Sequence, residues 1–101
     1  MVALSASRLI WSAIDPAYGR LVITDAELAT AVAGRPHWAP AGAGRAVYTV
    51  PGTLINVSVQ RVRYPVRHDR YMATVVRNGV VDRAVPYPTA ALAVSYAERV
   101  R

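Results

Sequence analysis

The chain has no cysteine, no lysine and no long hydrophobic run. Without cysteine it can form neither a disulfide bond nor a thiolate metal site, so its composition is silent on redox compartment. No stretch approaches the roughly 20 apolar residues that a membrane-spanning helix needs. The opening MVALSASRLIWSAI lacks the charged region and the small-residue cleavage pattern of a signal peptide, so we expect a cytoplasmic protein.

What the chain does contain is enough for a folded core. Of its 101 residues 53% are hydrophobic, so we expect residues 1–101 to form a single domain without disulfides or metal. Within it, residues 1–45 form a mainly helical portion and residues 46–101 a unit of strands and a helix. All 12 basic residues are arginine, as is typical of a GC-rich genome such as that of an actinobacterium or its phage.

The first half predicts helices followed by a loop. Residues 5–14 are compatible with a short helix or with a strand before the turn at Asp15-Pro16, and we favour the helix. Thr24, with Glu27 three residues later, forms a capping box for a helix over 25–33 that ends at Gly34. The Pro, Gly and Ala content of residues 35–45 predicts a loop, anchored by the side chain of Trp38.

The second half predicts antiparallel strands. A strand over 46–50 leads through a type II turn to a strand that begins at Thr53 and alternates apolar with polar residues. Arg61 and Arg63 would fall on its apolar side. We therefore expect either a bulge near Gln60-Arg61, which turns both arginines outward, or a strand that has left the core by Arg61. A polar connection over 65–70 follows.

Residues 71–77 and 80–85 predict a hairpin closed by Asn78-Gly79 in a type I′ turn, with Val76 opposite Val81 and Thr74 opposite Arg83. Both of its faces carry apolar side chains, so the sheet needs two covers. A C-terminal helix that starts after Thr89 supplies one, with an apolar stripe of Leu92, Ala93, Tyr96, Ala97 and Val100. The N-terminal helices or a second copy of the protein supply the other.

These elements predict an α+β fold. It consists of a three- to four-stranded antiparallel sheet packed by a C-terminal helix, with a helical N-terminal portion.

Residues that commonly carry catalysis or bind metals are few and scattered. His37 and His68 are the two histidines, and neither has a partner at metal-ligand spacing. The physics of a helix start accounts for Asp25 and Glu27. We therefore expect no enzyme, no cofactor and no metal, and no partner in the membrane.

Charge points instead to binding. The formal net charge is +6, and residues 51–101 hold eight arginines against three acidic residues, so an anionic partner is expected to meet the second half. Six arginines cluster in the strands and their connection: Arg61, Arg63, Arg67, Arg70, Arg77 and Arg83. They form either a solvated sheet face or an anion-binding surface, with nucleic acid as the first candidate.

One resemblance bears on this cluster. It is carried by Tyr71, Ala73, Val75, Gly79, Tyr87, Thr89, Ala93 and Ala97. On these residues, 53–100 resemble the three-strand-plus-helix module of the AP2-like and arm-type DNA-binding domains of phage integrases. The resemblance implies that the sheet lies in a major groove of double-stranded DNA and that Arg61, Arg63, Arg77 and Arg83 contact it. Val80 and Val81 depart from the family, which usually has polar or basic residues after the turn.

Two functional hypotheses follow. The first is a small non-enzymatic nucleic-acid-binding protein that uses the arginine-bearing sheet. The alternative is a protein–protein interaction module or a small oligomeric protein, such as a phage-encoded host modulator. It is motivated by the two apolar hairpin faces and by Trp11, Tyr18 and Trp38.

Overall fold

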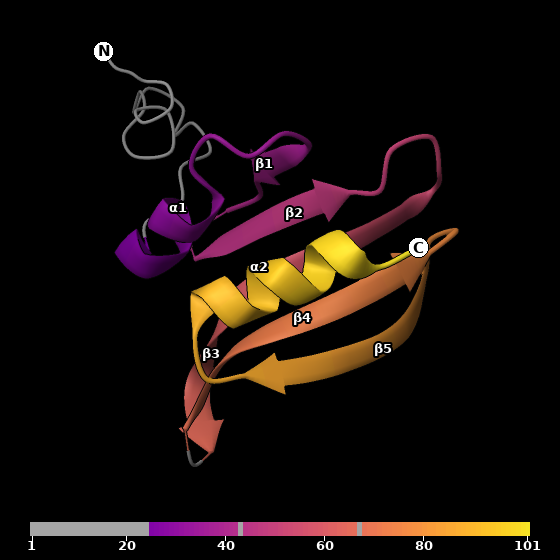
Figure 1. Ribbon diagram of the computed structural model, residues 1–101. Helices are drawn as coiled ribbons and strands as arrows, with labels where there is room; N and C mark the ends of the chain where they lie inside the picture. The colour runs from indigo at the N-terminus through magenta and orange to yellow at the C-terminus, as the bar shows by residue number, and fades with distance from the viewer. Residues whose placement is uncertain (1–24, 43, 67) are drawn as a thin grey trace.

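The computed structural model describes residues 25–42, 44–66 and 68–101, which form a five-stranded antiparallel sheet and two helices (Figure 1). In chain order the elements are α1 (Ala26–Val32), β1 (Trp38–Pro40), β2 (Arg45–Thr49), β3 (Ile55–Val66), β4 (Asp69–Arg77), β5 (Val80–Tyr87) and α2 (Ala90–Arg99). The strands lie side by side in chain order, so each one pairs with its neighbours in sequence. The α+β fold with a C-terminal helix is confirmed, but the sheet has five strands rather than three or four.

The additional strand, β1, lies inside the expected loop over 35–45. Trp38 pairs with Tyr48 of β2, and its side chain is buried. The indole Nε1 donates a hydrogen bond to Oε2 of Glu98 at 2.8 Å, which ties β1 to α2. Trp38 anchors the segment as expected. The segment still forms a strand despite Pro40, because a proline at the edge of a sheet removes no ladder hydrogen bond.

Helix α1 begins one residue later than expected. Oδ1 of Asp25 accepts a hydrogen bond from the backbone N–H of Leu28 at 3.0 Å, so Asp25 rather than Thr24 is the N-cap. Glu27 does not close a capping box, because its Oε2 accepts from the N–H of Ala90 at 2.9 Å. Gly34, at φ 74°, follows the helix end as expected. The expected element over 5–14, together with Trp11, Tyr18 and Thr24, lies outside the described residues.

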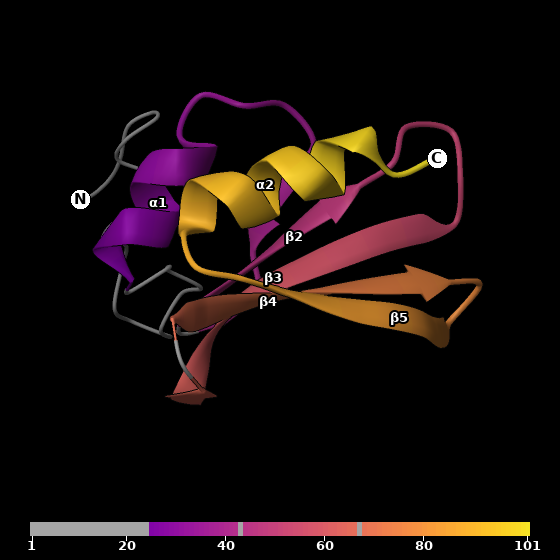
Figure 2. The ribbon, with the colours of Figure 1, turned by 60° about the horizontal axis from the view of Figure 1, so that its bottom comes forward.

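Both helices pack on the same face of the sheet (Figure 2), with α2 over β3 and β4 and α1 beside it. Alternate strand residues point into this layer, so Val57 and Val59 of β3 and Tyr71, Ala73 and Val75 of β4 are fully buried. The core cluster joins residues of both expected portions of the chain. Its members are Leu28, Val32, Trp38, Ala46, Tyr48, Val50, Val57, Val59, Tyr71, Ala73, Val75, Ala90, Ala93, Val94, Ala97 and Val100.

Helix α2 begins as expected, since Oγ1 of Thr89 accepts from the N–H of Leu92 at 3.2 Å. Ala93, Ala97 and Val100 of the expected stripe are buried, but Leu92 is 49% exposed. Ala90 and Val94 are buried as well, although the stripe did not include them. Small side chains let the helix backbone approach the strands closely, and this orientation leaves Leu92 in water.

Strand β3 does contain a register shift, but it lies later than the bulge expected near Gln60-Arg61. Strand β3 pairs regularly with β4 as far as Arg61 opposite Tyr71, and the register shift comes later, between Arg61 and Val66. Because the alternation is unbroken, Arg61 stays on the helix-covered side. The polar connection expected over 65–70 is also shorter, since Val66 already pairs with Asp69.

The hairpin of β4 and β5 turns at Asn78 and Gly79, whose φ angles of 52° and 80° are the two positive values that a type I′ turn requires. Val76 pairs with Val81 as expected. The register then shifts by one residue, because β5 contains a bulge at this point. Arg83 therefore pairs with Val75 rather than with Thr74, and it points to the helix-covered side.

Candidate functional site

The face of the sheet opposite the helices is not covered by any element that the structure describes (Figure 2). Strands β2 to β5 contribute three rows of side chains to this face. Every side chain in these rows is half-buried or exposed. We call these positions the open face. The rows are Thr49, Asn56, Val76 and Val81; Val47, Ser58, Thr74 and Ala84; and Arg45, Gln60, Met72 and Pro86.

The open face is almost without charge. Arg45 is its one charged residue, although 18% of the whole chain is charged. The side chains from β4 and β5 are mainly apolar, and those from β3 are small and polar. An antiparallel sheet that faces water usually carries polar and charged residues on that side, whereas the centre of a protein interface is depleted of charge. The composition of the open face therefore resembles an interface more than a solvated surface.

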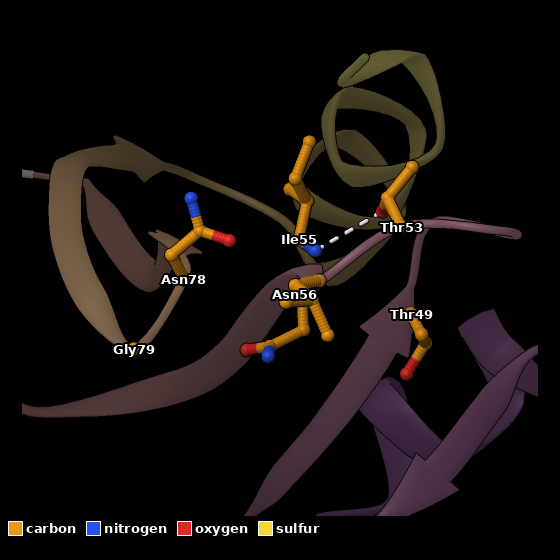
Figure 3. Close-up of a pocket in the computed structure, with 7 residues that line it drawn as sticks. Thr49, Thr53, Ile55, Asn56, Asn78 and Gly79 are labelled. Atoms are coloured by element: carbon orange, nitrogen blue, oxygen red, sulfur yellow. Dashed lines mark hydrogen bonds between the residues drawn. The ribbon is translucent and has the colours of Figure 1, made fainter.

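A shallow hollow lies at one end of the open face, between the β2–β3 loop and the β4–β5 turn (Figure 3). Its lining offers amides and hydroxyls, and none of its residues is titratable. It can accept and donate hydrogen bonds, but it supplies no acid, base or metal ligand. The lining residues are Thr49, Thr53, Leu54, Ile55, Asn56, Asn78 and Gly79.

The polar side chains of the hollow differ in how many of their hydrogen bonds are already made within the protein. Thr53 is already used within its loop, since its hydroxyl donates to the carbonyl of Val50 at 2.8 Å and accepts from the N–H of Ile55 at 3.0 Å. The amides of Asn56 and Asn78 come from β3 and from the turn (Figure 3). These amides match the backbone groups of a peptide.

Two of the expected site residues, Arg61 and Arg70, lie in an ion-pair network between α1 and the sheet. Nε of Arg61 donates to Oδ2 of Asp25, and its Nη2 donates to the Tyr71 hydroxyl at 2.9 Å. The Tyr71 hydroxyl in turn donates to Oδ1 of Asp25 at 2.7 Å. Nη1 of Arg70 lies 2.8 Å from Oε1 of Glu27. We call these five residues the Asp25 network.

The network holds its carboxylates ionised. Burial acts to raise the pKa of Asp25, but hydrogen bonds from Arg61, from the Leu28 N–H and from Tyr71 outweigh it and leave the pKa lowered. The hydrogen bond from the backbone of Ala90 is the largest cause of the lowered pKa of Glu27. Burial, followed by the hydrogen bond to Asp25, raises the pKa of Tyr71. A phosphate would thus have to compete with two internal carboxylates for Arg61 and Arg70.

Arg77 and Arg83 meet at the other end of the hairpin. Nε of Arg77 donates to Oδ2 of Asp82 at 3.1 Å, and Nε of Arg83 lies 3.7 Å from the same oxygen. Arg70 and Arg77 are seven positions apart on β4, which is roughly 23 Å along a strand. The structure therefore brings the four arginines together as two distant pairs.

Arg63, Arg67 and the two histidines are the other residues that the sequence singled out. Arg63 is exposed on β3 beyond the regular register, and Arg67 lies outside the described residues. The ring of His37 lies edge-on to Tyr48 at 6.4 Å between centroids, and His68 is exposed in a turn. Across the described ranges, no group of three or more His, Asp or Glu side chains could hold a metal ion.

The sequence predicted a nucleic-acid-binding surface on the arginines and a second apolar hairpin face covered by the N-terminal helices or by a second copy. Helix α1 does not supply that cover, because it packs beside α2 on the other face of the sheet (Figure 2). One signal for the open face was present: the outward positions of β3 are Asn56, Ser58 and Gln60, which are polar but uncharged. Which β5 residues belong to the open face depends on the register of β5, and the sequence did not predict the bulge that sets this register.

Comparison with known proteins gives no match to this chain, neither among family models nor among curated proteins nor among solved structures. The resemblance of residues 53–100 to arm-type DNA-binding domains stays a prediction. Neither of the helices described here is long and apolar enough to cross a membrane.

Proposed function

We propose that this protein is a small interaction module that binds another protein through the open face. The observation that carries the proposal is the near absence of charge on this face, where Arg45 is the one charged side chain. A face of this kind costs little to desolvate, because few of its groups lose strong hydration when a partner covers them.

The surroundings of the face support the same function. Apolar side chains from β4 and β5 adjoin the uncharged polar residues of β3, which can hydrogen-bond to a partner. Leu54, which is 75% exposed, stands at the rim of the hollow and adds an apolar anchor. Apolar patches bordered by hydrogen-bonding groups are the common anatomy of protein interfaces.

Site-specific photo-crosslinking in the source cells tests the proposal. A photoreactive phenylalanine analogue replaces Ser58, which lies between Val47 and Thr74 in the middle row, and the matched control places it at the exposed Thr30 on α1. We expect one discrete adduct from position 58 and none from position 30. The adduct should disappear when Thr74→Arg adds a charge beside the probe.

Mass spectrometry of the adduct identifies the partner. Equal adducts from positions 58 and 30 would contradict the proposal, as would an adduct that survives Thr74→Arg. The absence of any adduct from position 58 would do the same.

Nucleic-acid binding is the second candidate, and a specific observation favours it. Arg77 and Arg83 share the side-chain carboxylate of Asp82, and Nη1 of Arg77 also donates to the main-chain oxygen of Arg101 at 3.1 Å. This end of the hairpin thus gathers two guanidinium groups around one acidic side chain, in a chain of net charge +6. Fluorescence anisotropy of a labelled random-sequence duplex tests it at two salt concentrations. Binding should be tight at low salt and collapse at higher salt, because neutralised phosphates release counterions.

The matched variants are Arg83→Ala, which should weaken DNA binding, and Arg99→Ala on α2, which should leave it closer to the wild type. No binding at low salt would remove this candidate.

A further inference from the structure

The two edges of the sheet differ in length and exposure. β1 has three residues and ends in Pro40, whereas β5 has eight. Val80 and Val81 on β5 are 68% and 63% exposed. A long edge strand with exposed apolar residues offers its outward N–H and C=O groups to another strand. The β5 edge is therefore better suited than the β1 edge to pair with a strand of another chain.

The hydrogen bonds of β4 define which backbone groups of β5 point outward. The N–H of Asn78 donates to the carbonyl of Leu54 at 3.1 Å, on the β3 side. Along an antiparallel strand the bonding direction alternates from one residue to the next. Val76 lies two residues before Asn78 and Thr74 lies four before it. The backbone N–H and C=O groups of both therefore also bond to β3, and they form no hydrogen bonds with the residues opposite them on β5.

Those residues on β5 are Val81, opposite Val76, and Ala84, opposite Thr74. Their N–H and C=O groups therefore point away from β4, to the outside of the sheet. In a regular strand, residues three apart point in opposite directions. The bulge between Val75 and Val76 of the ladder inserts one residue into β5, so here Val81 and Ala84 point the same way.

We propose that β5 pairs with β5 of a second copy of this chain, antiparallel and about a two-fold axis between Asp82 and Arg83. Val81 of each copy exchanges both backbone hydrogen bonds with Ala84 of the other. The two sheets then form one continuous sheet with both pairs of helices on the same side, because the axis is perpendicular to the sheet.

The side chains match in this register. Val80 lies opposite Val85 of the second copy, Val81 opposite Ala84, and Asp82 opposite Arg83. Each apolar residue meets an apolar residue, and each charge meets its opposite. If the register slipped by one residue, Asp82 would face either Ala84 or Asp82 of the second copy. Charge and apolarity thus select the same register that the backbone groups allow.

The helices that the structure describes leave room for the pairing. Helix α2 lies mainly over β3 and β4, and three strand spacings separate β4 from its counterpart, roughly 14 Å. Two helices pack at about 8–10 Å, so the helices of the two copies do not collide. Pro86 has no N–H and ends the pairing next to the turn of the other copy.

This inference goes beyond the proposed function, because the dimer forms whether or not the open face binds another protein. It has a consequence for that function, however. The two open faces lie side by side on one surface, so a partner with a repeated binding site gains from binding both.

Light scattering behind a sizing column tests the dimer over a range of concentrations. The chain mass is 10.9 kDa, and we expect a species of twice that mass that dissociates on dilution. Asp82→Arg and Arg83→Asp each set like charges opposite one another and should raise the dissociation constant about ten-fold or more. The double variant Asp82→Arg/Arg83→Asp restores opposite charges and should recover the dimer.

Ala84→Pro is a second, independent variant. It removes an outward N–H that points away from every strand described in a single copy, so it should abolish the dimer while circular dichroism shows the fold intact. A wild type that is monomeric at its highest soluble concentration would overturn the proposal. A dimer that survives Ala84→Pro, or a double variant that does not recover, would overturn it as well.

Failure of the dimer and failure of the proposed function remain distinguishable. Thr74→Arg should remove the crosslink from position 58 and leave the dimer mass unchanged, whereas Ala84→Pro should halve the mass.

Discussion

The helix-covered face and the open face of the sheet are built from alternate residues of the same strands, yet they use charge in opposite ways. On the covered face, Arg61 and Tyr71 point towards α1 and complete a set of hydrogen bonds with Asp25. On the open face, the neighbouring positions Gln60 and Met72 carry no charge. On the covered face charged side chains attach α1 to the sheet, whereas the open face carries almost no charge.

The acidic residues of the helices show how this attachment is made. Glu27 of α1 accepts from the first N–H of α2, where a carboxylate is also favoured by the helix dipole. Glu98 of α2 binds Arg35 and Trp38, each at 2.8 Å. Each of these carboxylates joins two elements that are distant in sequence, so the helix layer is held by a few polar contacts in addition to its apolar core.

Substitutions at nearby positions of β4 on the two faces should differ most in their effect on the free energy of unfolding. Tyr71→Ala removes a fully buried ring and its hydrogen bond to Asp25, so we expect it to lower the free energy of unfolding by about 3–5 kcal/mol. Thr74→Ala on the open face should change it by less than about 0.5 kcal/mol. Urea denaturation measures both values.

Tyr71→Phe separates the hydroxyl from the ring and should cost about 1–2 kcal/mol. Equal losses for Tyr71→Ala and Thr74→Ala would remove the distinction between the faces.

The next effect concerns the Asp25 network itself. Asp25→Ala removes the N-cap of α1 and the acceptor of Arg61 and Tyr71, so we expect a loss of about 2–3 kcal/mol in thermal or chemical unfolding. Asp25→Asn keeps a capping oxygen and should cost less. If Asp25→Ala were tolerated as well as a substitution at the exposed Thr30, the network would not stabilise the attachment of α1.

Acid should weaken the covered face by a smaller amount than Asp25→Ala, because a protonated carboxyl keeps part of its hydrogen bonding. The pKa values of Asp25 and Glu27 are lowered in the folded protein, so the unfolded chain binds protons first as the pH falls. Their contribution is complete above the unfolded pKa values, near pH 4–5, and is lost progressively below them.

The melting temperature measured from neutral pH down to about pH 3 should therefore fall, and the fall should be shallower for the double variant Asp25→Asn/Glu27→Gln. An identical pH profile for this variant and the wild type would assign the acid sensitivity to other groups.

The predictable parts of the fold are those with a local cause. Asn78-Gly79 fixes the hairpin turn because both residues accept positive φ, and Thr89 fixes the start of α2 through its own side chain. The short strand β1 has no such cause, since its segment has the composition of a loop. Its pairing with β2 depends on Trp38 reaching Glu98, which is 60 residues away in sequence.

The candidate site was harder to predict for the same reason. Arg61 looked like a surface residue because its partner Asp25 is 36 residues away, and only the folded chain brings the two together. The bulge in β5 adds one residue without a marker in the sequence, and every later position of the strand changes face. Arg83 was therefore expected opposite Thr74 on the open face, whereas it pairs with Val75 on the covered side.

The smallest expected effect on stability gives the sharpest test of the open face. Thr74→Arg should leave the free energy of unfolding within about 0.5 kcal/mol of the wild type, because an exposed strand position tolerates a long polar side chain. Ala73→Arg, one residue earlier, places the same side chain at a fully buried position and should prevent folding. Chemical denaturation of the two variants makes the comparison at adjacent residues. If Thr74→Arg were as destabilising as Ala73→Arg, the open face would be buried within the protein itself, and a binding partner would no longer be needed to explain its lack of charge.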